Sequence, residues 1–375
     1  MTGEIESPVA LSAFPAILDD TYVLSRFAYL RVLDNTFVLA SPLTNRQLPI
    51  PTAPVLALLF KLREPVYLPA FLAELDPEMQ SHVVPILEQL CEHRFLARAD
   101  RDEAVDTWVR SNEDQGALRT WEFHDLLFHA QSRKGRGHQP VGGTYRFGRS
   151  APPLPPRKQY PGYPHLKLPV PELADLAATD ASFVSVMENR RSTRTFGSTP
   201  LTVAQLGEFL FRTCRVKTKK TANNKALVRR VYPSGGAMYP LEVYALVHRC
   251  DGLAAGLYHY DGLDHALTPL EVDENLLQRL QQDACRSASL SETPPILFCI
   301  SARFGRTAQK YESIAYSLIL KEVGVLYQTM WLAASAMHLA ACGLGSGNAD
   351  VFAQAIGSDY YAETSVGDFF LGPMP

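Results

Sequence analysis

Arg190, Arg191, Ser192 and Arg194 could together bind a phosphate group. Three guanidinium groups within five positions repel one another unless an anion compensates them. The arginine fork matches the oxygens of a phosphate, and a serine hydroxyl adds a short donor. The segment therefore predicts a phosphate site, although exposed arginines near a helix end are also common in proteins without one.

Pro233, Ser234, Gly235 and Gly236 form a second candidate segment, directly before a strand-like apolar run, LEVYALV. Because glycine has no Cβ, the backbone N–H groups of such a turn can approach the polar edge of a planar ring closely. Taken alone, the segment would be explained by an ordinary glycine turn before a strand. Together with the arginines it predicts a site for a flat, phosphorylated ligand.

The elements that position both segments lie in residues 176–375. Apolar periodicity predicts a helix over 182–190, and the capping box Thr202-x-x-Gln205 opens another. Strand patterns follow at 241–248, 256–270 (a hairpin), 294–300 and 364–372. The mixture predicts an α+β fold.

The segment from Val323 to Leu344 has no charged residue and is long enough to span a bilayer. It nevertheless contains polar residues, and its small residues suit close helix packing. We therefore predict a helix buried on all sides in a soluble core or a dimer, and no membrane partner.

Residues 1–110 predict a small winged-helix-like domain. Short strand-like segments precede three helical segments and a closing strand, at 29–33, 36–41, 46–50, 53–62, 67–75, 81–93 and 94–100. With nine Lys and Arg against fifteen Asp and Glu, this domain is a poor reader of DNA. It is better suited to binding a peptide by strand addition.

Residues 111–175 predict a helical segment at 120–136 and then a proline-rich linker or arm. Eight prolines between positions 151 and 172 remove donors and fix φ, so this stretch is expected to be extended and semi-rigid.

The basic run between Lys217 and Arg230 predicts a solvated hairpin loop, with a docking surface for an acidic peptide or carrier protein as the alternative.

Composition excludes several classes of protein. A formal net charge of −3 gives no support to a nucleic-acid partner. The six cysteines contain no C-x-x-C pair, so neither a structural metal site nor a disulfide framework is predicted. The N-terminus is acidic where a signal peptide would be basic, and a cytoplasmic location is expected.

Several motifs, in one order, carry a family resemblance. The run R-R-S-x-R-x-F at 190–196 resembles the FMN-binding signature of nitroreductase-fold enzymes. The run YPSGGAMYPLEVY resembles a motif of their SagB-type branch, the azoline dehydrogenases of thiazole/oxazole-modified peptides. WEFHDLLFHAQSR, and Lys310-Tyr311 followed by a long helix from Ile314 to Leu344, also resemble that branch.

The resemblance implies an FMN enzyme built as a homodimer, with each flavin at the subunit interface. It assigns the flavin contacts to Arg190, Arg191, Ser192 and Arg194, to the ring-side loop Pro233, Ser234, Gly235 and Gly236, and to Gly343, Leu344 and Gly345 at the end of the long helix. Two departures shift phosphate binding toward the early arginines. The branch's E-T-P-V is here Glu363-Thr364-Ser365-Val366, and no Lys or Arg follows Lys321.

The reaction that the resemblance implies is the oxidation of a thiazoline or oxazoline, or of a related bond, in a peptide natural product. The ring loses a proton and a hydride, and Lys310 with Tyr311 is the implied base. A lysine acts as a base near neutral pH only where burial or a nearby cation lowers its pKa. A surface lysine beside a core tyrosine is the structural alternative.

Two other functions stay open at this point. One is an NAD(P)H-dependent nitroreductase or ene-reductase, and the other is a redox-inactive peptide-binding scaffold. The expected partners are a peptide or carrier-bound peptide substrate and a cyclodehydratase or a peptide synthetase.

Overall fold

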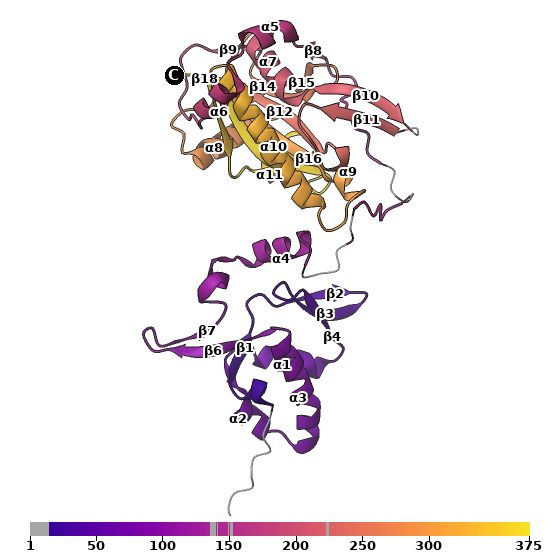
Figure 1. Ribbon diagram of the computed structural model, residues 1–375, viewed down its shortest axis with the longest axis vertical. Helices are drawn as coiled ribbons and strands as arrows, with labels where there is room; N and C mark the ends of the chain where they lie inside the picture. Colours follow the sequence, from indigo (N-terminus) through magenta and orange to yellow (C-terminus); the bar gives the residue numbers. More distant parts are fainter. Residues whose placement is uncertain (1–14, 136–139, 141, 149, 151–152, 223–224) are drawn as a thin grey trace, which may run out of the picture. The chain divides into compact units, whose positions relative to one another are not determined.

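The computed structural model describes residues 15–135, 140, 142–148, 150, 153–222 and 225–375 (Figure 1). The chain divides into two compact units, Met1–Gln139 and Pro140–Pro375. The helix expected near 120–136 belongs to the first unit, and the described part of the proline-rich arm belongs to the second.

In its described residues, the first unit contains two antiparallel sheets and four α-helices. One sheet has the order β5-β1-β6-β7 and the other the order β2-β3-β4. The strands are β1 (Thr21–Leu24), β2 (Tyr29–Leu33), β3 (Thr36–Ser41), β4 (Arg46–Ile50), β5 (Val66–Tyr67), β6 (Leu96–Asp102) and β7 (Thr107–Arg110). The helices are α1 (Ala53–Lys61), α2 (Leu68–Ala73), α3 (Pro77–Glu92) and α4 (Phe123–Ser132), with short 3₁₀ turns at Ala16–Leu18 and Gly116–Thr120.

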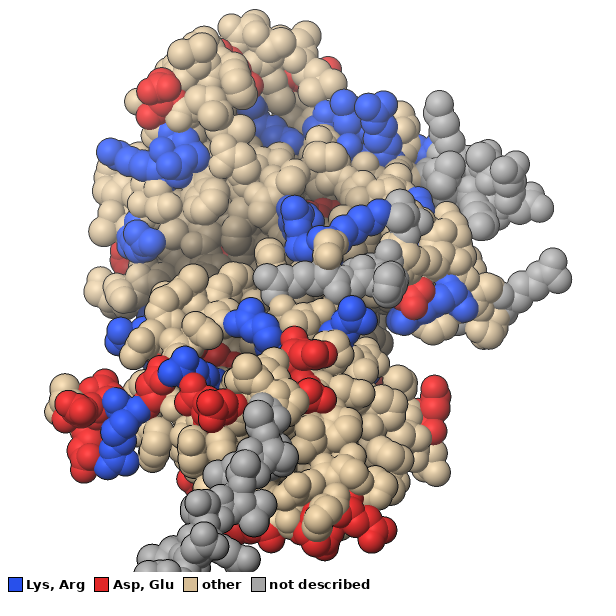
Figure 2. Space-filling model, turned by 60° about the horizontal axis from the view of Figure 1, so that its bottom comes forward, with Lys and Arg blue, Asp and Glu red and all other residues tan. Residues whose placement is uncertain are grey.

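A leucine-rich core holds the first unit together, with Leu62, Leu72 and Leu90 fully buried. The strands and helices predicted for residues 29–100 are confirmed as elements. Acidic side chains are prominent on the visible surface of this unit (Figure 2). The winged-helix assignment itself stays a prediction.

The second unit is built on a seven-stranded sheet whose paired strands all run antiparallel. Its order is β17-β18-β16-β12-β14-β15-β8. The strands are β8 (Leu166–Lys167), β12 (Leu241–Val247), β14 (Gly256–Asp261), β15 (Ala266–Leu270), β16 (Ile296–Arg303), β17 (Leu339–Leu344) and β18 (Glu363–Pro373). A short parallel pair joins β9 (Leu201–Thr202) to β13 (Cys250–Asp251).

Helices cover both faces of this sheet (Figure 1). Alternate residues of β16 enter different cores, Ile296 and Phe298 on one face and Leu297 and Cys299 on the other. The first core includes α7 (Val203–Cys214) and α10 (Ala315–Ala336), and the second includes α8 (Glu274–Ala288) and α11 (Ala349–Ala355). The remaining helices are α5 (Leu173–Thr179), α6 (Phe183–Asn189), α9 (Phe304–Ala308) and the 3₁₀ turn η3 (Gly235–Ala237).

Local sequence signals explain several elements of the second unit. The capping box predicted at Thr202 and Gln205 is confirmed at the start of α7. The basic run forms a two-stranded antiparallel ribbon, β10 (Val216–Ala222) with β11 (Lys225–Arg230), which confirms the hairpin. The prediction that the whole run is solvated was wrong for Arg230, which is buried.

The predicted long helix was wrong at its C-terminal end. α10 stops at Ala336, and Leu339–Leu344 form β17, which pairs with β18. His338 has φ of 52°, a left-handed conformation that ends the helix. Within the predicted segment Val325 is 36% exposed, so its own chain does not bury α10 on all sides, and burial in a dimer stays a prediction. Among the described residues, no helix has the length and apolarity that crossing a membrane requires.

Candidate functional site

The glycine loop lies directly beside Lys310 and Tyr311. Gly236 has φ of 61°, and the Lys310 ammonium donates a hydrogen bond of 3.2 Å to its carbonyl oxygen. A Cβ on Gly236 would contact the Tyr311 hydroxyl and would lie 2.6 Å from the Lys310 Nζ. Any other residue would have to displace these two side-chain tips, and the positive φ of this position also favours glycine.

Lys310 and Tyr311 are held by the turn that follows α9. Both backbone N–H groups donate to the carbonyl oxygen of Thr307, at 3.1 and 3.0 Å, and Thr144 donates at 2.9 Å to the carbonyl of Lys310. The Lys310 ammonium lies 5.4 Å from the Tyr311 ring centroid. Two groups able to accept or donate a proton therefore sit together over the loop.

A buried carboxyl group fixes the other side of this loop. Ser234 donates a 2.5 Å hydrogen bond to Glu322 of α10 and accepts one of 2.8 Å from the Tyr239 backbone. Glu322 is 4% exposed, and its Oε1 has no partner among the described residues. Burial raises the pKa of Glu322 to about 7, against the opposing effects of the Ser234 hydrogen bond and the charges of Arg230 and Arg306.

The arginine segment lies at the end of α6. Arg190 caps this helix, and its guanidinium carbon lies 5.6 Å from the centroid of the Trp331 ring on α10. Thr193 donates a 3.0 Å backbone hydrogen bond to Ala341 of β17. Arg191, Ser192 and Arg194 are exposed, and no ion pair between described residues includes the three predicted phosphate-binding arginines.

Gly343, Leu344 and Gly345 lie on the same side of α10 as Arg190. A Cβ on Gly343 would lie 3.0 Å from the Tyr327 ring and 3.2 Å from the Trp331 ring. Gly343 and Leu344 belong to β17 and Gly345 follows it, so their predicted place at a helix end is corrected. Leu344 and Gly345 line a cavity of about 280 Å³ with Tyr316, Leu320, Ser346, Gly347, Ser365, Val366, Gly367 and Asp368.

Within one chain, the arginine segment and the glycine loop contact different faces of α10. Arg190 lies against Trp331, whereas Ser234 bonds to Glu322, nine positions earlier. At about 100° per residue, nine residues correspond to roughly half a turn around the helix. The structure therefore joins the loop to Lys310 and Tyr311, and the arginines to Gly343, but it does not join these two groups to each other.

Two family models match this chain. The nitroreductase family matches residues 187–368, and the cyanobactin oxidase ThcOx matches residues 22–138. We refer to the matched residues, 187–368, as the nitroreductase-family domain. Both the arginine segment and the glycine loop lie inside this domain, as do Lys310 and Tyr311.

Three curated proteins resemble parts of the chain. A Methanocaldococcus jannaschii protein named as a nitroreductase is 27% identical over 48% of this chain and 84% of its own length. The trifolitoxin-processing protein TfxB of Rhizobium leguminosarum is 31% identical over 30% of this chain and 31% of its own length. The microcin B17-processing protein McbC of Escherichia coli is 34% identical over 30% of this chain and 42% of its own length.

These matches confirm the family resemblance seen in the motifs. The nitroreductase-family domain and the separate oxidase match place the chain among the oxidoreductases. The chain spans less than half the length of the two peptide-processing relatives.

Sequence reasoning missed Glu322 and Arg306 near the nitroreductase-family site. Arg306 is buried and donates to the carbonyl oxygens of Met238, at 2.7 Å, and Leu154, at 2.7 Å. It thus ties the end of the glycine loop to the proline-rich arm. Glu322 could have been identified as a charged residue at the edge of a long apolar helix. No local feature of the sequence marks Arg306.

Glu322 is expected to make the free energy of unfolding fall as the pH rises from about 4.5 to about 7. In this window the folded state keeps the proton, since burial raises the pKa of Glu322 to about 7, whereas the unfolded state has released it. The unfolded state therefore binds fewer protons, and the lost stability amounts to about 3 kcal/mol.

Urea unfolding at pH 5 and pH 7.5 checks this expectation in the wild type and Glu322→Gln. The glutamine keeps an acceptor for Ser234 but has no proton to lose in this range, so the variant should lose less stability between the two pH values. The buried Asp368, whose pKa burial raises to about 6, contributes equally to both proteins. Identical pH dependence in the two proteins would contradict the assignment.

Proposed function

We propose that this chain is an FMN-dependent dehydrogenase that oxidises a thiazoline or oxazoline in a peptide to the corresponding azole. The observation that carries the proposal is the cluster of Lys310, Tyr311 and Gly236, inside the nitroreductase-family domain. The oxidase match over 22–138 and the similarity to two proteins that process peptide products, trifolitoxin and microcin B17, support a peptide substrate.

The residues present fit the chemistry of FMN. Arg190, Arg191 and Arg194 offer guanidinium groups that no described carboxylate pairs with, and Ser192 adds a hydroxyl. Gly343 and Gly236 keep the backbone free of side chains at two further positions. When bound, FMN accepts the hydride that the azoline ring loses.

We further propose a homodimer in which the flavin lies between the arginine segment of one subunit and the glycine loop of the partner subunit. The support is that the two groups contact different faces of α10 within one chain. α10 also exposes apolar side chains, with Leu320 37% and Val325 36% exposed. Packing against a second subunit would bury apolar surface of this helix and bring the two groups together.

In this proposal Lys310 removes the ring proton. The carbonyl of Gly236 holds the ammonium group in place when it is charged, and Tyr311 orients the amine or shares the charge of the developing anion. The substrate is a peptide, either ribosomal or tethered to a carrier protein, supplied by a cyclodehydratase or a peptide synthetase. The segment matching the oxidase family, 22–138, is proposed to bind part of that peptide.

Anaerobic mixing with an azoline-containing peptide tests the proposal. The purified protein should be yellow, release FMN and not FAD, and lose its flavin absorbance on mixing, with the azole as product. NAD(P)H alone should reduce the flavin slowly. Fast reduction by NAD(P)H without azoline oxidation would instead indicate a nitroreductase or ene-reductase. A colourless protein that takes up no FMN would indicate a scaffold.

A further inference from the structure

A second cavity, of about 260 Å³, lies between the arm, the ribbon and the sheet of the second unit. Its size falls below the ~300–1,000 Å³ of sites that enclose a whole small molecule, so it suits a single side chain or a chain end. It is lined by Pro155, Pro156, Arg157, Lys158 and Gln159 of the arm, by Val216, Lys219, Val228 and Arg230 of the ribbon, and by Glu242, His259, Tyr260, Asp261, Gly262 and Leu263 of the sheet.

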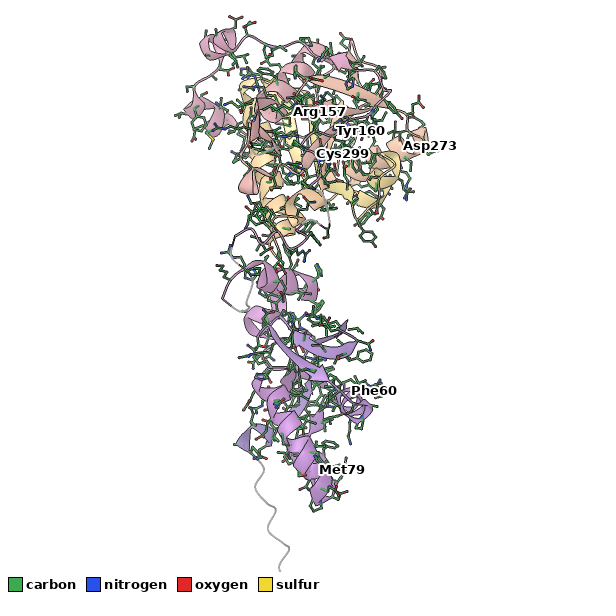
Figure 3. The ribbon with its side chains drawn as sticks, turned by 90° about the vertical axis from the view of Figure 1, so that its right-hand side faces the viewer. Phe60, Met79, Arg157, Tyr160, Asp273 and Cys299 are labelled. Carbon is green, nitrogen blue, oxygen red and sulfur yellow. The ribbon has the colours of Figure 1, made fainter. Side chains whose placement is uncertain are left out.

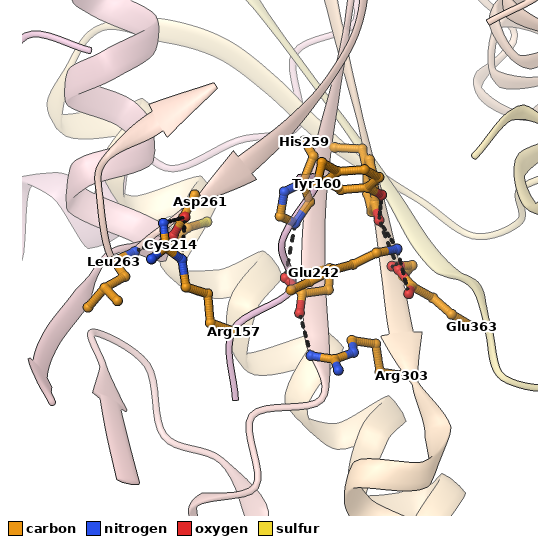
Figure 4. A network of polar contacts seen from close by, with 12 residues as sticks. Arg157, Tyr160, Cys214, Glu242, His259, Asp261, Leu263, Arg303 and Glu363 are labelled. Carbon is orange, nitrogen blue, oxygen red and sulfur yellow. Dashed lines mark hydrogen bonds and ion pairs between the residues drawn. The ribbon is translucent and has the colours of Figure 1, made fainter. Parts of the chain in front are cut away.

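The cations of the arm are already paired with carboxylates. Arg157 donates a 2.7 Å hydrogen bond to Asp261 and also pairs with Asp264. Lys158 donates at 2.8 Å to Glu363 and at 2.7 Å to the hydroxyl of Tyr244. These contacts fix the arm residues against the sheet and leave neither cation free for a ligand. Arg157 and Tyr160 of the arm are labelled in Figure 3, and Figure 4 shows the contact of Arg157 with Asp261.

The carboxylate on the cavity wall is also satisfied. Glu242 lies 3.2 Å from His259 and accepts a 3.3 Å hydrogen bond from Arg303 (Figure 4). Although burial alone would raise it, the pKa of Glu242 is lowered to about 2 by His259, Arg230 and Arg303. Glu242 is therefore ionised but already held by two partners.

Arg230 is a buried cation of the cavity that makes no ion pair with a described carboxylate, although its charge acts on Glu242 from a greater distance. It is 7% exposed, its Nε has no hydrogen-bond partner among the described residues, and no ion pair between described residues includes it. Its recorded hydrogen bond is a long one, 3.5 Å, to the carbonyl of Cys214. Burial disfavours this charge, and Glu242 and Glu322 favour it only from beyond ion-pair distance, so an anion in the cavity would stabilise the guanidinium further.

A second cation reaches the cavity from the same face of the ribbon. Lys219 pairs with Val228, and Arg230 with Val216, so these four residues share the inner face. Lys219 is exposed at the rim, and no ion pair between described residues includes it. The cavity thus presents an inner guanidinium and an outer ammonium to one small group.

We propose that this cavity binds a carboxylate of the peptide substrate, with Arg230 as its inner partner and Lys219 as its outer partner. The inference rests on the proposed peptide substrate and adds to it a charge requirement. The arm wall of the cavity is tied to the glycine loop through Arg306, which donates to Leu154 and Met238. A carboxylate held here would anchor the peptide near the loop that carries Gly236.

Three synthetic pentapeptides with identical glycine flanks test the proposal on the full-length protein by equilibrium binding, without turnover. The first has a central glutamate and blocked ends, the second a central glutamine and a free C-terminal carboxylate, and the third a central glutamine and blocked ends. The wild type should bind the first or the second at least about tenfold more tightly than the third, because each of these two offers a charge-assisted hydrogen bond. Whichever carboxylate is preferred identifies the source, a side chain or a chain end.

Variants assign the preference to the cavity. Arg230→Gln should abolish it, and Lys219→Ala should weaken it several-fold without any change in the buried network. Arg229→Ala is the matched control, because it removes an exposed ribbon cation that does not line the cavity. Equal binding of all three peptides by the wild type overturns the proposal, as does a preference that survives Lys219→Ala and Arg230→Gln.

If Arg230→Gln does not fold, Lys219→Ala compared with Arg229→Ala tests the proposal. A carboxylate preference that falls equally in both variants, or in neither, counts against binding in the cavity. Failure of this inference is distinct from failure of the proposed function. A protein that oxidises azoline peptides but shows no carboxylate preference refutes the cavity assignment alone.

Discussion

Replacing Lys310 with alanine is expected to slow flavin reduction by an azoline peptide about 10²- to 10⁴-fold, the usual contribution of a general base. The Lys310 ammonium contacts the carbonyl of Gly236 and the Tyr311 ring, and it makes no ion pair among the described residues, so the truncation removes little that holds the fold together. Bound FMN and the dimer should persist. Anaerobic stopped-flow measurement of the flavin band isolates this step from reoxidation.

Tyr311→Phe separates chemistry from packing at the same place. It keeps the ring beside Lys310 and removes only the hydroxyl, which lies where a Cβ of Gly236 would be. A large rate loss in this variant would therefore be chemical. Lys217→Ala, on the exposed ribbon, is the matched control and should leave the rate unchanged. If Lys310→Ala bleaches the flavin as fast as the wild type, the proton leaves by another route.

Most elements of the second unit could be predicted because their signals are local. The buried strands at 241–247 and 296–303 are apolar runs bounded by proline or polar residues, and the capping box marks the start of α7. The end of α10 could not be predicted in this way. The run without charged residues continues through His338, and the change from helix to strand depends on a positive φ and on pairing with β18, a strand that lies later in the chain.

The candidate site was predictable by residue type more than by arrangement. Motifs selected the arginine segment and the glycine loop, but their placement on different faces of α10 follows from helical phase and packing. Arg306 escaped notice, and Arg230 was predicted to be solvated in a hairpin, because the contacts that bury them join the arm, the ribbon and the loop, which lie far apart in the chain. A charge that is buried by residues far away in the chain leaves no local signal in the sequence.

Replacing both Arg190 and Arg194 with alanine is expected to weaken FMN binding by about 10²- to 10⁴-fold. Each lost charge-assisted hydrogen bond to the phosphate costs on the order of 1.5 to 3 kcal/mol, and Arg190→Ala also removes the guanidinium that lies 5.6 Å from the Trp331 ring. The double variant should therefore be purified colourless and regain its colour only at high FMN concentration.

Titration of the apo-protein with FMN, at two salt concentrations, measures this loss. The wild type should lose affinity as salt rises, whereas the double variant should show a smaller salt dependence because two of its phosphate contacts are gone. Arg98→Ala with Arg101→Ala, on β6 of the first unit, removes the same charge away from the nitroreductase-family domain and should leave FMN affinity unchanged. Stoichiometric FMN in the Arg190 and Arg194 double variant would show that the phosphate is held elsewhere. In that case the arginines at the end of α6 would be only a solvated helix terminus.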